Sequence, residues 1–168
     1  RIVNAAANRA GYPLEVYHGT LSDKEFSVFR NPRKGIWTAF SEKEAQPGSG
    51  EQRSRTMRLR VDLGKNPITL SKEALNDWQH SKSPLKWMRD FAGYRWKQYG
   101  YDDYPTSVII PEYATVVFRP EQLKSAEPFT YDSKGNLIPV SKRFDAANKN
   151  INYSIEDLST EQIANLSP

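Results

Sequence analysis

The chain has 168 residues, a net charge of +4, two histidines and no cysteine. The lack of cysteine excludes disulfides, thiolate zinc sites and thiol nucleophiles, and two histidines about sixty residues apart do not predict a metal site. No run of 18 apolar residues and no secretory signal is present, so no membrane partner is expected. The length suits one domain, and the start at Arg1 suggests a domain cut or processed from a longer polypeptide.

The positive charge lies in the first part of the chain. Residues 1–100 hold 18 Lys and Arg against 10 Asp and Glu, whereas residues 101–168 hold 6 against 10. The densest basic patch is Arg53, Arg55, Arg58 and Arg60. Such a distribution favours a polyanionic ligand, either a dinucleotide pyrophosphate or a nucleic-acid backbone. The alternative is an ordinary solvated face.

In chain order, the alanine-rich residues 2–10 predict a short helix that ends at Gly11. A first strand is expected over residues 14–17, and a second over residues 36–40 after the turn at 31–35. Ser41 would then cap a helix start. Alternating apolar and polar residues predict a strand over 57–63, with a short extension at 68–70.

Two helices are expected next. Ser71 would cap the first, and the second would run from Ser83 to Tyr99 with an apolar stripe along one face and Gly100 at its end. Buried strands are predicted at 106–110 and 113–118, followed by a turn at 120–123.

The last part of the domain is predicted to be a hairpin. It covers residues 129–140, with its turn at Asp132-Ser133-Lys134-Gly135-Asn136. Beyond it, polar composition indicates a tail with a weak helix at 156–165. The expected fold class is α+β, with a domain over residues 1–145 and a tail or linker over 146–168. No βαβ rhythm, phosphate loop or internal repeat is visible.

One short stretch combines chemistry with backbone freedom: Tyr17-His18-Gly19-Thr20. A β-prone run carries a histidine directly into a glycine, and a glycine lets the backbone approach a ligand closely. His18 is therefore the stronger candidate of the two histidines. The alternative is a histidine that only stabilises a turn.

Together with further motifs in order, this stretch resembles the ADP-ribosyltransferase fold of the diphtheria-toxin and poly(ADP-ribose) polymerase branch, which carries a His-Tyr-Glu set on three strands. The chain is most similar to ADP-ribosyltransferase domains of phage and mobile-element polyvalent proteins. The resemblance covers about residues 11–145. Its motifs are Tyr17–Thr20, Gly35-Ile36-Trp37, Leu59-Arg60-Val61 with Asn66-Pro67, Gly100-Tyr101-Asp102, and Val116-Val117-Phe118 within 116–126.

The resemblance implies split antiparallel β-sheets, two or three flanking helices, and NAD+ as co-substrate. It implies that His18 binds the adenosine-side ribose, that the Gly19 backbone holds the nicotinamide amide, and that Thr20 supports the turn. Trp37 falls where the family has a nicotinamide-stacking tyrosine, and Phe40 is the other candidate unless it is simply a core residue. Indole offers the π-face that this role needs.

The glutamate of the family has no counterpart at the aligned position of this chain. Aligning the family's strand end with Val117-Phe118 places Ala114 at the glutamate position. Glu112 lies two residues earlier, on the same face of an extended strand, and would reach the ribose if the strand began early or bulged. An exposed glutamate after Pro111 is the alternative, and Asp102 and Asp103 are outside candidates.

Three cations before the second predicted strand are candidates for the pyrophosphate. Arg33 is the main one, because a guanidinium fits phosphate geometry, with Arg30 and Lys34 beside it. A solvated basic turn is the alternative. No residue set predicts a metal ligand.

The expected function is an NAD-dependent mono-ADP-ribosyltransferase that modifies a protein or nucleic acid. It would be part of a larger phage, mobile-element or bacterial effector polypeptide and would act in the cytoplasm of a bacterial cell or after delivery by a virion. The alternative is a degenerate module that binds nucleic acid or protein through the patch between Arg53 and Arg60. An RNA 2'-phosphotransferase is a weaker hypothesis. That related fold needs further arginines and a second histidine near the phosphate, and the sequence around His80 does not fit this role. The acceptor and the oligomeric state stay open.

Overall fold

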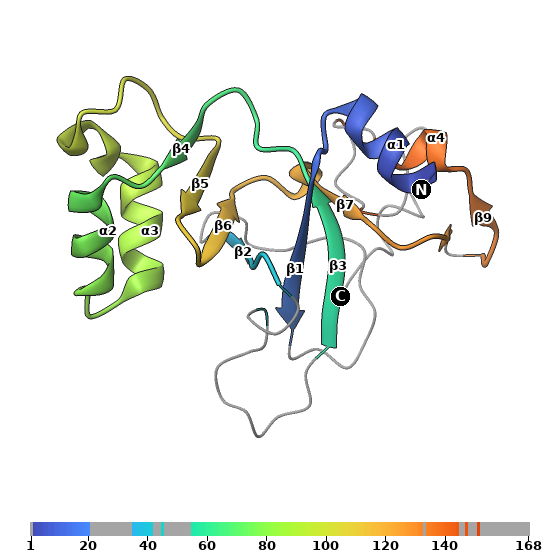
Figure 1. The fold of residues 1–168 in the computed structure, drawn as a ribbon, viewed down its shortest axis with the longest axis horizontal. Helices are drawn as coiled ribbons and strands as arrows, with labels where there is room; N and C mark the ends of the chain where they lie inside the picture. The colour runs from blue at the N-terminus through green and yellow to red at the C-terminus, as the bar shows by residue number, and fades with distance from the viewer. Residues whose placement is uncertain are drawn as a thin grey trace.

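The computed structural model describes residues 2–20, 35–41, 45, 55–132, 134–144, 147 and 151. These residues form a mixed α+β fold, as predicted, with two main sheets and a small hairpin (Figure 1). Figure 1 shows the helices α2 and α3 at one end of the described fold, and α1 and α4 at the other. In the described part of the chain, no helix is long and apolar enough to cross a bilayer.

The first sheet contains three antiparallel strands in the order β1-β3-β7. β1 (Leu14–Thr20) pairs with β3 (Arg55–Val61) over its whole length, and β3 pairs with β7 (Leu123–Ser125). The predicted alternation in β3 is confirmed, since Met57, Leu59 and Val61 face the core. β7 was not predicted. The turn expected at 120–123 includes its first residue, and its other two residues, Lys124 and Ser125, are polar.

The second sheet is mixed rather than purely antiparallel, with the order β2-β6-β5-β4. β2 (Ile36–Thr38), β6 (Ala114–Val117) and β5 (Ser107–Ile110) are antiparallel, but β4 (Pro67–Thr69) runs parallel to β5. The expectation of split antiparallel sheets is therefore wrong for this edge. A parallel pair needs a long crossover, and two helices between β4 and β5 provide it.

Those two helices are α2 (Lys72–Gln79) and α3 (Pro84–Gly93). Ser71 caps α2 as predicted, because its hydroxyl accepts a hydrogen bond from the Ala74 amide. The single helix predicted from Ser83 to Tyr99 is wrong. The backbone of Tyr94 leaves helical geometry, and the short helix η2 (Arg95–Tyr99) then packs the Tyr99 ring 5.7 Å from Phe91. Because α3 and η2 both contribute residues to the predicted apolar stripe, the sequence pattern does not reveal the break between them.

The second sheet separates two buried clusters. Ala114 and Val116 of β6 pack with Trp78, Met88 and Phe91 on the helix side. Ile36 and Val117 face the other way and pack with the three-stranded sheet, in a cluster that also contains Val16, Met57, Leu59, Val61, Leu123 and Ile151. The two sheets are thus stacked through alternate side chains of β2 and β6.

A buried arginine attaches α1 (Ile2–Ala10) to the three-stranded sheet. Arg60 is 5% exposed, and its guanidinium donates hydrogen bonds to the carbonyls of Tyr12 and Pro13 and to the side chains of Asn4 and Asn8. Since every partner belongs to α1 or the turn after it, Arg60 holds the helix in place.

The predicted hairpin is confirmed as β8 (Thr130–Tyr131) and β9 (Leu137–Ile138), with Asp132 accepting backbone hydrogen bonds across the turn. A short helix, α4 (Val140–Arg143), follows, and η3 (Pro120–Gln122) forms the turn before β7. Most of residues 146–168, including the helix expected at 156–165, lies outside the described residues. Ile151 packs in the core, and its carbonyl accepts a hydrogen bond from the Ser125 amide.

Candidate functional site

His18 lies where the two sheets meet. Its strand, β1, is joined to β2 by a bridge in which the backbone N–H groups of Tyr17 and Ala39 each donate to the other residue's carbonyl, at 2.9 and 2.7 Å. His18 follows directly, opposite Met57 in β3 and on the same face of β1 as the buried Val16. Its half-buried imidazole therefore lies at the boundary between the sheets rather than on an outer surface.

The imidazole is held by a backbone contact. Its Nδ1 lies 2.7 Å from the carbonyl oxygen of Trp37. Since a carbonyl can only accept, Nδ1 carries the proton and donates. Burial lowers the pKa of His18, and the hydrogen bond to Trp37 opposes this shift to a smaller extent. A neutral ring with its proton on Nδ1 has a lone pair on Nε2, which can accept a hydrogen bond from a hydroxyl.

Gly19 and Thr20 end the same strand. They pair with Thr56 and Arg55 of β3. The backbone at Gly19 therefore lies one residue beyond the held imidazole, as the sequence predicts. The side chain of Thr20 lies outside the described residues.

The structure brings the Trp37 backbone to His18 but turns the indole away. The Trp37 ring stacks on Trp78 of α2, with centroids 6.0 Å apart and planes at 26°. Tyr113 meets Trp78 edge-on at 5.3 Å, which completes a row of three rings on the helix side of the second sheet. The indole is therefore not on the face of the sheet that meets His18.

Phe40 is placed differently from Trp37. The chain is extended from Ile36 to the bridge at Ala39 and bends at Phe40, so the alternation of the strand ends before that side chain. Ile36 packs in the cluster between the sheets, and 37% of Phe40 is exposed. Of the two predicted stacking aromatics, Phe40 is the more exposed, and it directly follows the bridge that joins β1 to the second sheet.

Glu112 lies in the tight turn between β5 and β6. Strand β6 begins at Ala114, so it neither starts early nor bulges toward Glu112. Glu112 has φ 62°, a left-handed conformation that is uncommon for a residue with a Cβ. Thr115 pairs with Thr38. Glu112 comes three residues earlier in the chain and lies outside this strand pairing.

The other carboxylates considered are Asp102 and Asp103. Both are exposed in the connection between η2 and β5. The Asp103 carboxylate accepts a hydrogen bond from the amide of Tyr104, which is typical of a turn. No group of three or more potential metal-ligating residues is present in the described part of the chain.

The predicted basic contacts are only partly described. Arg30, Arg33, Lys34 and Arg53 lie outside the described residues, as does the side chain of Arg55. Arg58 pairs with Glu15 at 2.7 Å, and Arg60 is buried beneath α1. The two described side chains of the patch therefore stabilise the three-stranded sheet and α1.

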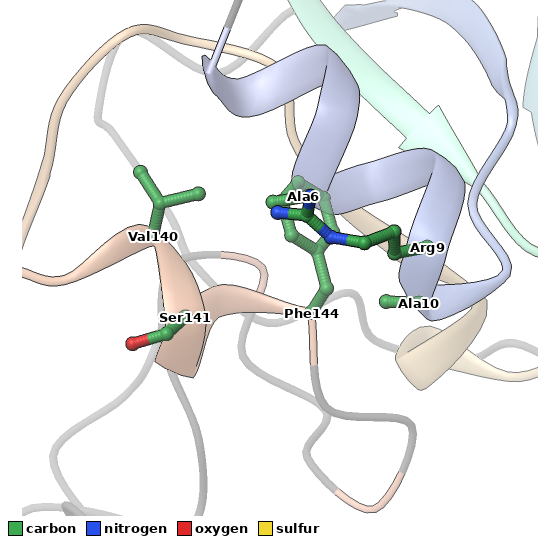
Figure 2. Close-up of a pocket in the computed structure, with 6 residues that line it drawn as sticks. All are labelled: Ala6, Arg9, Ala10, Val140, Ser141 and Phe144. Atoms are coloured by element: carbon green, nitrogen blue, oxygen red, sulfur yellow. The ribbon is translucent and has the colours of Figure 1, made fainter.

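A separate hollow of about 320 Å³ lies between α1 and α4 (Figure 2). Its walls are Ala6, Arg9 and Ala10 from α1 and Val140, Ser141 and Phe144 from the region of α4. It contains none of the predicted site residues. Arg9 and Ser141 were not predicted to belong to a site, and no sequence motif marks them. The Ser141 hydroxyl is a potential nucleophile, but the residues that line this hollow include no histidine, lysine or carboxylate that could activate it.

The arrangement at His18 offers a hydrogen-bond acceptor, a glycine backbone and an accessible aromatic ring at the meeting of two sheets. Comparisons with protein-family models, with curated proteins and with solved structures found no match. The case for function therefore depends on the residues themselves and on the motif resemblance.

Proposed function

We propose that the chain is an NAD-dependent mono-ADP-ribosyltransferase that modifies a protein or nucleic-acid acceptor. The observation that supports this most is the 2.7 Å contact between His18 Nδ1 and the Trp37 carbonyl. This contact holds Nε2 as an acceptor, which is what a site needs to orient a ribose through one of its hydroxyl groups. It also joins the two motifs on which the resemblance depends most, although they belong to different sheets.

In the proposed reaction, the bond between the nicotinamide nitrogen and the ribose C1' breaks, and neutral nicotinamide leaves. A nucleophilic oxygen or nitrogen of the acceptor attacks C1' and loses a proton, so that ADP-ribose is transferred. Positive charge develops on the ribose before attack, and a nearby carboxylate would stabilise it.

Different residues would bind different parts of NAD+. His18 would hold the adenosine-side ribose, and the backbone of Gly19 would bind the carboxamide. Phe40 would lie against the nicotinamide ring, since the indole of Trp37 is engaged with Trp78. Glu112 is the proposed carboxylate that stabilises charge on the ribose. Its turn would have to approach His18 when NAD+ binds. Arg33 remains the candidate for the pyrophosphate.

The motif resemblance supports a setting for this activity. We infer a larger phage, mobile-element or bacterial effector polypeptide that acts inside a bacterial cell. The acceptor would be a macromolecule of that cell.

The direct test is release of nicotinamide from NAD+, measured by liquid chromatography with bacterial lysate as the acceptor source. His18→Ala should reduce release by about 100-fold or more, because orientation of the ribose is lost. His80→Ala is the matched control, since His80 is an exposed histidine at the end of α2 and should leave the rate unchanged. The proposal fails if the wild-type protein neither binds NAD+ in calorimetry nor releases nicotinamide.

A catalytically degenerate binding module is the second candidate. The observation that favours it is Ala114, a buried alanine at the first position of β6, where the family's acid is expected. Binding of NAD+ without release of nicotinamide, unchanged in Glu112→Gln, would support this second reading. The described side chains of the patch between Arg53 and Arg60 do not favour that patch as its surface, because Arg60 is buried.

A further inference from the structure

The basic charge of the described fold is concentrated on α3 and η2. Residues 82–97 contain five basic side chains and one acidic side chain, a net charge of +4 that equals the charge of the whole chain. Figure 1 places α3 at the end of the described fold away from α1 and α4. A local excess of this size creates a positive potential that attracts polyanions.

The cations of α3 form one exposed face. Lys86 and Arg89 are three positions apart, and the buried Met88 and Phe91 lie on the opposite side of the helix. Lys82, just before the helix, is also exposed. The one acidic residue of this segment, Asp90, lies 3.9 Å from the Arg89 guanidinium, at the limit of an ion pair, and leaves the charge of the segment largely uncompensated.

Aromatic side chains accompany these cations where α3 ends. The Tyr94 ring is 54% exposed, and the Arg95 guanidinium lies 5.6 Å from its centroid while donating a hydrogen bond to its hydroxyl. The exposed Lys97 ammonium lies 5.3 Å from the Trp96 ring. An accessible ring beside a cation provides a stacking surface next to a phosphate contact.

We propose that this surface, the α3–η2 face, binds single-stranded nucleic acid. The face is defined by Lys82, Lys86, Arg89, Tyr94, Arg95 and Lys97. The cations contact backbone phosphates, and the exposed Tyr94 ring stacks on a base. Sequence-independent binding of this kind combines several cations with an accessible aromatic ring, and the α3–η2 face has both.

This inference goes beyond the proposed transferase activity and does not depend on it. The face is built from α3, η2 and the residues that directly flank α3, whereas the proposed transferase site lies at the meeting of β1 and β2. Binding is therefore expected to persist in His18→Ala. The α3–η2 face also differs from the patch between Arg53 and Arg60. In the described part of the chain, its cations contact residues adjacent in sequence and do not attach another helix or strand, as Arg60 does.

The test uses fluorescence anisotropy with a fluorescein-labelled single-stranded DNA of mixed sequence. Five phosphate contacts predict that affinity falls about 100-fold between about 50 and 200 mM salt, with a logarithmic slope of about −3.5. The variant Lys82→Glu/Lys86→Glu/Arg89→Glu should reduce the slope to about −1.4 and weaken binding at the lower salt more than about tenfold. Tyr94→Ala should weaken binding of the single strand about tenfold, but that of a duplex with the same sequence much less.

The matched control is Arg9→Glu/Lys65→Glu/Lys134→Glu. It makes the same change in net charge with the same residue types at exposed positions outside the face. Thermal melting of each variant establishes that the fold is retained. Normal binding by the control with weak binding by the α3 variant supports the proposal. Equal losses in the two variants, or no salt-dependent binding by the wild-type protein, would overturn it; in the latter case an acidic protein becomes the partner to examine.

Discussion

The imidazole of His18 and the backbone carbonyl of Trp37 lie 2.7 Å apart, although the two residues belong to different sheets. The contact forms beside the bridge between Tyr17 and Ala39, which brings β1 and β2 together. A histidine held in this way has a defined tautomer and a defined position. Both are needed for a side chain that has to orient a substrate hydroxyl.

The lowered pKa of His18 predicts a pH-dependent stability. The unfolded chain takes up a proton at His18 near the ordinary pKa of 6.5, whereas burial keeps the folded imidazole neutral to lower pH. Protonation therefore favours the unfolded state. The free energy of unfolding should be fully retained above pH 6.5 and should decrease as the pH falls from there through the lower pKa of the folded protein.

Urea unfolding followed by tryptophan fluorescence between about pH 5 and 7.5 measures this effect. His18→Gln should flatten the decrease, and His80→Gln should retain it. An identical pH dependence in the wild-type protein and His18→Gln would contradict the assignment to His18.

The different exposure of Trp37 and Phe40 predicts two different effects. Trp37→Ala should lower the free energy of unfolding by about 3 kcal/mol, because the ring packs against Trp78 in the core. The milder Trp37→Phe should leave NAD+ affinity unchanged. Phe40→Ala should weaken NAD+ binding about tenfold with little loss of stability, because its ring is accessible.

Calorimetric titration with NAD+ and urea unfolding of the same samples separate the two effects. A loss of NAD+ affinity in Trp37→Phe but not in Phe40→Ala would show that the indole leaves Trp78 to bind the nicotinamide ring.

Glu112 is expected to combine a cost in stability with a role in activity. Its left-handed backbone conformation is unfavourable for a residue with a Cβ. Glu112→Gly should therefore raise the free energy of unfolding by about 0.5–1 kcal/mol. Glu112→Gln keeps the size of the side chain and the backbone strain, and removes only the charge. It should lower nicotinamide release by about 100-fold without a change in stability.

Asp102→Asn is the control for the loss of a carboxylate elsewhere on the surface. Normal release by Glu112→Gln together with a loss in Asp102→Asn would transfer the catalytic assignment to Asp102.

Arg60 and Arg58 are neighbours on β3 with different expected contributions. Arg60→Met would leave the carbonyls of Tyr12 and Pro13 without their donor and should lower the free energy of unfolding by about 3 kcal/mol. Arg58→Ala removes an ion pair with Glu15 that is partly exposed to solvent, and should cost about 0–1 kcal/mol. Thermal unfolding of the two variants gives the comparison. Similar losses in both would show that Arg60 does not anchor α1.

Much of the local structure follows from short-range patterns in the sequence. The first helix, the alternation in β3, the Ser71 cap and the turn at Asp132 were predicted at or close to their observed positions. Each depends on residues within about one turn or one strand of one another, so the required information is local. The choice of His18 as a candidate site residue also depends on local sequence, because the glycine follows it directly, and its role stays a prediction.

Other features were decided only by contacts between distant segments. The break in the predicted helix at Tyr94 and the parallel pairing of β4 with β5 depend on how η2 and the two helices pack on the sheet. The same holds for Arg60, which a linear pattern assigns to a basic surface and the fold buries beneath α1. By itself the sequence determined the first helix, most of the strands and the cap of α2. The packing of helices and sheets decided that the Trp37 ring lies on the helix side of β2, because strand alternation defines two faces but not which layer covers each of them.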